Sequence, residues 1–267
     1  MKISVIGIGN MGQALVAGFL SNGPVVPTEV TLFDTDLPKG KAFADEKGCL
    51  FCSDIKEAVK DSDYCLLAVK PQVIDQVIFS LLPALNEKTV VISIAASVKI
   101  SRLRTLLRDT TPIVRIMPNT PAMVGAAVNA VCADKVSPEA LEFVSQLFLT
   151  CGIVVPCTES QLDAIGCVSG TGPAYVMLFI ESLADAAVKL GMPRDVALKI
   201  AAQTVYGSGK LAVETHTHPA ILKDQVCSPG GTTIEGVLAL EKHGLRAAVE
   251  AAVIAADEKT KLLAGGS

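Results

Sequence analysis

The sequence predicts an α/β fold in which a doubly wound, mainly parallel sheet is followed by an all-α domain. Short apolar strands alternate with helical segments as far as Pro156. A glycine-rich turn joins the first strand to the first helix. After Pro156 the β-branched runs stop and Ala-rich helical segments begin. Alternating strands and helices are typical of a parallel sheet that is covered on both faces.

The chain opens with a strand, a turn, a helix and a second strand. Ile3–Ile6 is predicted to be a buried strand, and the turn Gly7–Gly12 follows it directly. Apolar residues at helical spacing predict a helix over Gln13–Leu20, which Asn22-Gly23 is expected to end with a left-handed cap. The second strand is expected at Val30–Phe33. This order is that of a βαβ unit.

The remaining elements follow from the same periodicities. Further strands are predicted at Leu50–Cys52, Tyr64–Val69, Thr89–Ile94, Ile113–Met117, Ala126–Cys132 and Gly152–Pro156, with helices at Gln72–Leu85, Lys99–Leu107 and Pro138–Phe148. Beyond them, helices are predicted at Pro173–Leu190, Arg194–Glu214, Thr232–His243 and Leu245–Leu263. The change from alternating strands and helices to Ala-rich helices alone predicts two domains, residues 1–158 and 159–267.

Composition and charge narrow the class of protein. Half of the 267 residues are hydrophobic, which is enough for a packed core, and the net charge of −4 does not favour binding to nucleic acid. The basic group Arg102, Arg104 and Arg108 is interpreted as a solvated helix face. We expect no signal peptide and no apolar run long enough to span a membrane, and hence no membrane partner.

The eight cysteines are scattered, mostly within apolar runs, which favours a reduced, cytoplasmic protein. Cys49 and Cys52 have C-x-x-C spacing, but no second pair or nearby histidine completes a zinc site. His216 and His218 are expected in an exposed turn, and His243 at the end of a helix. We therefore expect no metal cofactor.

The turn after the first strand has the spacing of a dinucleotide-binding loop. Gly7 permits a tight turn, Gly9 lets the backbone approach a pyrophosphate, and Gly12 lets the helix pack near the strand. The helix N-terminus then presents free N–H groups and a positive dipole to the phosphates. Because the motif follows the first strand and opens a helix, it predicts a Rossmann-type domain.

Two charged residues stand where strands end. Asp34 ends the second strand, where an acidic residue typically bonds the adenosine ribose and repels a 2′-phosphate. A surface aspartate that begins a turn is the alternative interpretation. Lys70 leaves the strand that ends at Val69, at the edge where open α/β sheets bind ligands. It could reach cofactor phosphate, ribose or a substrate carboxylate, or be an exposed lysine before a helix.

The segment 174–190 is apolar on more than one face of its predicted helix. A small helical domain cannot cover such a helix on every side. We therefore predict a homodimer with interlocked helices.

Motifs spread along essentially the whole chain resemble those of the pyrroline-5-carboxylate reductases, which make proline from a cyclic imine. Besides the glycine loop they are Ala68–Pro71, Ser93–Ala96, Met117–Pro121, Ser169–Tyr175 and Leu222–Thr233. The resemblance implies NAD(P)H-dependent reduction of 1-pyrroline-5-carboxylate to L-proline by a Rossmann domain followed by an all-α dimerisation domain. Relatives also form rings of dimers, which nothing in this sequence shows.

The resemblance also implies the site residues. Those for the cofactor are Ile6, Gly7, Ile8, Gly9, Asn10, Met11, Gly12, Ala68, Val69, Lys70, Pro71, Ala95, Ala96 and Asn119, with Thr120 beside the nicotinamide. Asp34 is added to them from its position at the end of the second strand. Those for the substrate are Glu159, Gln225, Ser228, Gly230, Gly231, Thr232 and Thr233, and the catalytic residues are Thr233 and Lys70. The two glycines also suit a carboxylate by themselves, because they leave N–H groups bare at a helix start. An ordinary capped helix is the alternative.

Three positions depart from the family pattern. Many relatives carry a small hydroxyl or a basic group where Asp34 stands, so Asp34 favours NADH or mixed use. Relatives often have asparagine where this chain has Ile55 and Gln225. Some contacts with the adenosine half and with the substrate are therefore expected to differ.

The reduction of an imine requires little from the protein beyond holding the substrate and the cofactor in position. A protonated imine is already electrophilic, so we assign Thr233 orientation of the substrate and relay of a proton from water. A β-hydroxyacid dehydrogenase would need a lysine early in the first interdomain helix, and none lies between Gly166 and Ala187. A nucleotide-binding regulator without catalysis would not need the loop Ser228–Thr233.

Overall fold

The computed structural model describes residues 1–265, which form two compact units. The first comprises residues 1–170 together with the chain from Asp257 onward, and the second comprises Thr171–Ala256. The segment 159–170, which the sequence assigned to the helical domain, is therefore compact with the sheet. The last two residues of that predicted domain, 266–267, lie outside the described residues.

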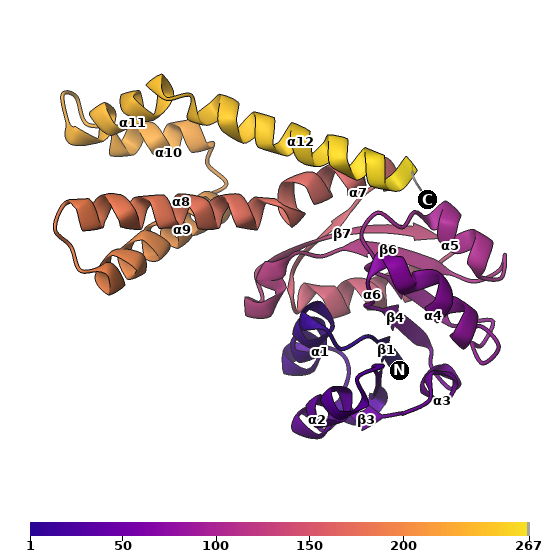
Figure 1. The fold of residues 1–267 in the computed structure, drawn as a ribbon. Helices are drawn as coiled ribbons and strands as arrows, with labels where there is room; N and C mark the ends of the chain where they lie inside the picture. The colour runs from indigo at the N-terminus through magenta and orange to yellow at the C-terminus, as the bar shows by residue number, and fades with distance from the viewer. Residues whose placement is uncertain (266–267) are drawn as a thin grey trace. The chain divides into compact units, whose positions relative to one another are not determined.

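The first unit contains an eight-stranded sheet in the order β3-β2-β1-β4-β5-β6-β7-β8 (Figure 1). The strands are β1 Ile3–Ile6, β2 Val30–Phe33, β3 Leu50–Phe51, β4 Tyr64–Leu67, β5 Val90–Ser93, β6 Ile113–Met117, β7 Ala127–Asp134 and β8 Gly152–Pro156. All neighbouring strands are parallel except β6 and β7. The order of β3 to β6 reverses between β1 and β4, which is the switch point of a Rossmann sheet.

The helices of this unit are α1 Asn10–Asn22, α2 Leu37–Lys47, α3 Ile55–Val59, α4 Ile74–Leu81, α5 Ile100–Leu106, α6 Pro138–Leu149 and α7 Glu159–Ile165. Short 3₁₀ turns lie at Pro27–Glu29, Pro71–Val73 and Thr120–Val124, and a π-helical turn, η4, spans Gly166–Gly170.

Alternate residues of the strands fill two separate apolar cores, one on each face of the sheet. Ile3 and Val5 belong to the core that includes residues of α1, α2 and α6. Ile6 belongs to the core that includes residues of α3, α4 and α5. Because successive strand residues point to opposite faces, Ile3, Val5 and Ile6 of β1 supply both cores. The predicted doubly wound sheet is confirmed.

The sequence-based prediction was wrong about the end of α1, and it missed the helix α2. Gly23 is extended rather than left-handed, and a glycine is needed there because an added Cβ would lie 2.0 Å from the carbonyl oxygen of Phe19. The ends of α2 are set locally, since the Asp36 carboxylate accepts the Lys39 N–H (3.2 Å) and Gly48 adopts the left-handed cap conformation with φ +72°.

The group of arginines near α5 is not a solvated helix face. Arg108 donates to the carbonyl oxygens of Leu85 (2.7 Å) and Leu82 (3.1 Å) after the end of α4. Arg104 donates to backbone carbonyls at 108, 109 and 111 and pairs with Asp134. These two guanidinium groups satisfy carbonyls that have no helical partner, while Arg102 forms an exposed pair with Asp75.

A buried arginine holds α7 against the sheet. Arg115, in the middle of β6, is only 2% exposed, and its guanidinium bonds Glu159 (3.0 Å) and Asp163 (2.7 Å). The same Glu159 oxygen accepts the N–H of Ile100 at the start of α5 (2.6 Å). One cation therefore joins a central strand to the first two turns of α7, and through Glu159 to α5.

The second unit is entirely helical among its described residues. It contains α8 Gly172–Lys189, α9 Arg194–Thr215, α10 Pro219–Val226, α11 Thr232–Lys242 and the first part of α12 Leu245–Gly265. Helices α8 and α9 pack around the buried residues Ala184, Ala197 and Ala201. Pro173, Pro193 and Pro219 lie at helix starts, as predicted.

Large apolar side chains remain exposed on every long helix of this unit. They include Met177 and Leu178 on α8, Tyr206 and Val213 on α9, and Ile254 on α12. The helical run 159–189 is also long and apolar enough to cross a membrane by length and composition, although no such run was expected, and only 17% of its most apolar part is buried. This unit has far more apolar surface than it covers by itself.

Replacing Arg115 with leucine should lower the free energy of unfolding by about 2 kcal/mol, because two carboxylates lose charged hydrogen bonds inside the unit. Urea unfolding at one fixed protein concentration measures this change. Arg102→Leu is the matched control, since its exposed pair with Asp75 should contribute less than about 1 kcal/mol. Equal losses for the two variants would contradict the role given to Arg115.

Candidate functional site

The glycine loop brings β1, α1 and β4 closer together than side chains would allow. Gly7 has φ +100°, and a Cβ there would lie 2.6 Å from the carbonyl oxygen of Ala68. A Cβ on Gly12 would lie 2.2 Å from the carbonyl oxygen of Gly7. At Gly9, by contrast, an added Cβ would meet nothing within 4 Å. Two glycines therefore serve internal packing, and the third leaves open space for a ligand.

The start of α1 is prepared to receive an anion. Gly9 is the N-cap residue, no side chain caps the first turn, and that turn contains no acidic residue. Its first N–H groups have no intrahelical partners and lie at the positive end of the helix dipole. Together with the open space at Gly9, this fits the pyrophosphate of a dinucleotide.

Asp34 lies directly beyond β2 and is bonded to the glycine loop. Its Oδ2 accepts the N–H of Ile8 (2.6 Å), and its Oδ1 accepts the N–H of Asp36 (2.9 Å). The first bond crosses from β2 to the loop after β1, so it also fixes the carboxylate in place. A fixed negative charge therefore stands beside the loop predicted to bind phosphate.

The predicted residues after β4 and β5 reach the same edge of the sheet. Ala68 donates its N–H to Ile6 (2.8 Å) and, with Val69, packs against Gly7. Lys70 is exposed and precedes the 3₁₀ turn Pro71–Val73. Ala95, directly after the β5 exit, is buried. The structure thus brings the loop, Asp34 and Ala68–Val69 into contact, with Lys70 beside them in the chain.

Asn119, two residues beyond β6, is 7% exposed and has both ends of its side-chain amide engaged. Its Oδ1 accepts the N–H of Val128 (3.0 Å), and its Nδ2 donates to the carbonyl oxygen of Ser169 (2.8 Å) in the π-helical turn. The side-chain amide is therefore engaged at both ends inside the protein, and the backbone carbonyl of Asn119 also accepts the N–H of Ala122 (3.0 Å).

The predicted substrate loop lies between α10 and α11 in the second unit. Gly230 has φ +66°, and Gly231 donates its N–H to Ser228 (3.0 Å). A Cβ on Gly231 would lie 2.3 Å from Ser228 Oγ. No side chain caps α11, so the N–H groups of its first turn, including those of Thr232 and Thr233, have no capping partner. This arrangement suits a carboxylate.

Two other predicted substrate residues have different surroundings. Gln225 is exposed near the end of α10. Glu159 has its Oε1 engaged by Arg115 and by the N–H of Ile100. A contact between Glu159 and a substrate would therefore have to come from Oε2.

The cysteines offer no evident nucleophile. Burial raises the pKa of the Cys65 thiol to about 12, and it raises the pKa of Cys132, which the Glu159 carboxylate raises further. The cysteines form no disulfide within residues 1–265. Within residues 1–265, no group of three or more His, Cys, Asp or Glu side chains could hold a metal ion.

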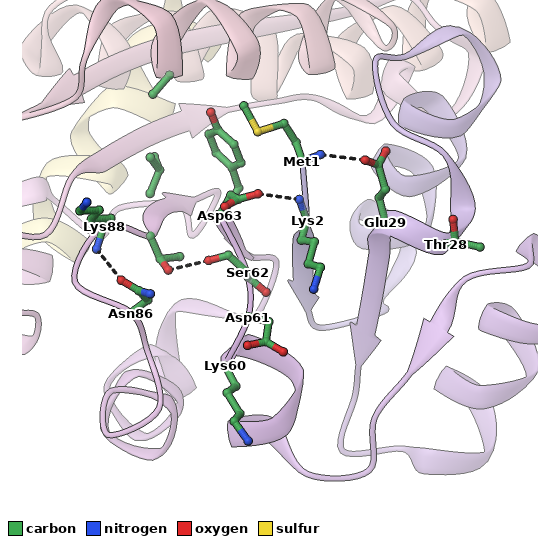
Figure 2. A pocket seen from close by; sticks show the side chains of 14 residues that line it. Met1, Lys2, Thr28, Glu29, Lys60, Asp61, Ser62, Asp63, Asn86 and Lys88 are labelled. Carbon is green, nitrogen blue, oxygen red and sulfur yellow. Dashed lines mark hydrogen bonds and ion pairs between the residues drawn. The ribbon is translucent and has the colours of Figure 1, made fainter.

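A pocket of about 820 Å³ lies at the opposite edge of the sheet (Figure 2). Its lining includes Lys2, Asp63 and Thr89, which precede β1, β4 and β5. Figure 2 shows that its charged groups are partly paired with one another, as in the contact of the Met1 amino group with Glu29 (2.7 Å). Ligands of open parallel sheets bind at the carboxyl ends of the strands, so this pocket is not the predicted site.

Sequence reasoning missed the internal contacts of Arg115 and Asn119. A signal for the first was present, because an arginine interrupts the otherwise apolar strand Ile-Val-Arg-Ile-Met. The second had no local signal, since Ser169 lies 50 residues from Asn119 in the chain.

The fold and the glycine loop define an NAD(P)H-dependent oxidoreductase of the Rossmann class. The family model of NADP oxidoreductases, coenzyme F420-dependent, matches residues 2–97. The family model of pyrroline-5-carboxylate reductase dimerisation matches residues 159–263.

Whole-chain relatives identify the family. The chain is 41% identical to the pyrroline-5-carboxylate reductase of Escherichia coli K12 over 263 residues, which are 98% of each chain. It superimposes on the Plasmodium falciparum enzyme with NADP bound at a TM-score of 0.89 and 32% identity, covering 99% of this chain and 98% of that one. For the Coxiella burnetii enzyme the TM-score is 0.91 at 32% identity, covering 98% of both. The chain belongs to the pyrroline-5-carboxylate reductase family.

Substituting alanine for Gly9 should abolish tight cofactor binding without unfolding the protein, because a methyl group there fills only open space. Substituting alanine for Gly12 should instead lower the stability, because its Cβ would meet the Gly7 carbonyl at 2.2 Å. Thermal unfolding and titration with NAD(P)H, followed by fluorescence, separate the two effects. Normal cofactor affinity in the Gly9 variant would place the dinucleotide elsewhere.

Proposed function

We propose that this reductase holds NAD(P)H at the carboxyl edge of the sheet and the carboxylate of 1-pyrroline-5-carboxylate at the start of α11. The observation that carries the first part is the uncapped start of α1 beside open space at Gly9. The second part rests on the uncapped start of α11 after Gly230-Gly231. The proposed cofactor residues are 6–12, Asp34, 68–71, Ala95, Ala96 and the backbone of Asn119.

The proposed substrate residues are Glu159, Gln225, Ser228, Gly230, Gly231, Thr232 and Thr233. The N–H groups of the first turn of α11 bind the carboxylate, helped by the positive end of the helix dipole. Lys70, an exposed cation at the carboxyl edge, binds phosphate, ribose or the substrate carboxylate. Most of the rate enhancement comes from holding the reactants in a productive geometry.

The cofactor supplies a hydride to the imine carbon, and the ring nitrogen carries or receives a proton. A protonated imine is electrophilic without further activation, so the protein needs no strong acid. The hydroxyl of Thr233 orients the ring nitrogen and relays a proton from water. No metal is required for this chemistry, and none is proposed.

We propose that Asp34 favours NADH over NADPH, or at least permits NADH. Its carboxylate is fixed by the N–H groups of Ile8 and Asp36, so it cannot easily turn away from an adenosine 2′-phosphate. Repulsion between like charges disfavours that phosphate. The Plasmodium falciparum relative was solved with NADP, so relatives of this fold also accept the phosphorylated cofactor.

The dimerisation family model supports a homo-oligomer, and the exposed apolar residues of α8 to α12 support a dimer as its smallest form. We propose that a ring of dimers is the larger assembly, and that the enzyme works in the cytoplasm with small molecules as its only ligands.

Steady-state kinetics with 1-pyrroline-5-carboxylate should give a higher kcat/KM with NADH than with NADPH. Asp34→Ser should shift the ratio toward NADPH by about tenfold, which corresponds to roughly 1.4 kcal/mol of relieved repulsion. Asp36→Ser is the control: it removes an aspartate two residues away whose side chain caps α2, and should leave the ratio unchanged within twofold. A strong preference of the wild type for NADPH would overturn the role of Asp34.

Thr233→Ala should lower kcat by at least tenfold while Thr233→Ser retains most of it, because only the hydroxyl relays the proton. The KM for the imine should change less, since the backbone N–H groups that bind its carboxylate remain in both variants. An alanine variant with unchanged kcat would remove Thr233 from the reaction.

A further inference from the structure

Asn119 stands between two segments that are far apart in the chain. Its Oδ1 accepts the N–H of Val128, in β7, and its Nδ2 donates to the carbonyl of Ser169, in the π-helical turn. Both distances, 3.0 Å and 2.8 Å, are those of good hydrogen bonds. An amide is the side chain that can accept from one partner and donate to the other at the same time.

The π-helical turn at Gly166–Gly170 has i→i+5 hydrogen bonds in place of the regular ladder of an α-helix. The residue four positions after Ser169 is Pro173, which has no N–H to donate to the Ser169 carbonyl. Asn119 supplies a donor for this carbonyl. Met117, the last residue of β6, packs on the same turn, because a Cβ on Gly166 would lie 3.2 Å from Met117 Cε and one on Gly170 would lie 3.5 Å from it. Two residues at the exit of β6 therefore hold the turn, one by hydrogen bonding and one by packing.

We propose that Asn119 is a positioning residue for hydride transfer, and that its side chain acts by locking the π-helical turn to the exit of β6 rather than by touching the cofactor. This inference rests on the proposed cofactor site at the carboxyl edge of the sheet. The lock fixes the backbone of 117–120, the segment that leaves β6 at that edge. Small displacements of the groups that line a reacting centre are costly, since a shift of about 1 Å can lower a rate on the order of a hundredfold.

Asn119→Asp is the sharpest test, because the carboxylate keeps the acceptor for Val128 but turns an oxygen toward the Ser169 carbonyl. A buried asparagine elsewhere in the sheet provides a matched control. Asn129, in β7, donates from Nδ2 to the carbonyls of Phe148 and Ile153, both at 3.1 Å. Asn129→Asp makes the same chemical change at a fully buried position, 0% exposed against 7% for Asn119, whose side-chain bonds go to Phe148 and Ile153 and not to the π-helical turn.

In Asn119→Asp, amide hydrogen exchange over residues 166–172 should be at least tenfold faster, and kcat should fall at least tenfold. The Kd for NAD(P)H should stay within threefold of the wild type, because the side chain does not contact it. In Asn129→Asp, exchange over 166–172 and kcat should both stay within twofold. Asn119→Ala offers a second route if the aspartate variant fails to fold, because it removes both side-chain hydrogen bonds without burying a charge. It should show the same fall in kcat with unchanged cofactor affinity.

A tenfold weaker Kd for NAD(P)H in Asn119→Asp would overturn the proposal, because the side chain would then be a cofactor ligand. Faster exchange of the turn with unchanged kcat would also overturn it, since the lock would be purely structural. A failure of the proposed cofactor site itself is recognised separately: Gly9→Ala would then bind NAD(P)H normally.

Discussion

The geometry of the backbone groups at the carboxyl ends of the strands depends on how closely the start of α1 approaches β1 and β4. The carbonyl of Gly7 occupies the space that a side chain on Gly12 would need, and Ala68 occupies the space beside Gly7. This approach aims the N–H groups of α1 at the open space around Gly9. It also places the N–H of Ile8 where Asp34, directly beyond β2, accepts it. The proposed cofactor site and the proposed preference for NADH thus rest on the same short contacts.

The strands and most helices could be predicted because burial leaves a strong periodic signal. Each residue of β1 is buried, and alternate residues enter different cores, as an apolar strand between two helical layers requires. Helix α2 lacks such a signal. It has few apolar residues, and its ends are set by Asp36 and Gly48. Capping residues are ambiguous in sequence, because the same residue types also form turns.

The candidate site likewise contains features that the sequence could predict and features that it could not. The glycine loop has a characteristic local spacing, which by itself points to a dinucleotide site. The loop before α11 is assigned chiefly by the family resemblance, because two glycines before a helix also fit an ordinary capped helix. Arg115 bonds partners 44 and 48 residues away. Asn119 bonds partners 9 and 50 residues away, so only the fold reveals these contacts together. Glu159 illustrates the difference, since family resemblance assigns it to the substrate while its Oε1 serves Arg115 and Ile100.

The helical unit contains more apolar residues than its own core can bury. Three alanines form its buried centre, while Met177 and Leu178 are about two-thirds exposed. Lipid could cover an apolar helix of this length, but α8 also carries Glu181 and Asp185 within its apolar stretch. Carboxylates inside a bilayer are costly unless they are paired within a bundle. The match to a dimerisation domain supports a second copy of the chain, rather than lipid, as the cover of these apolar residues.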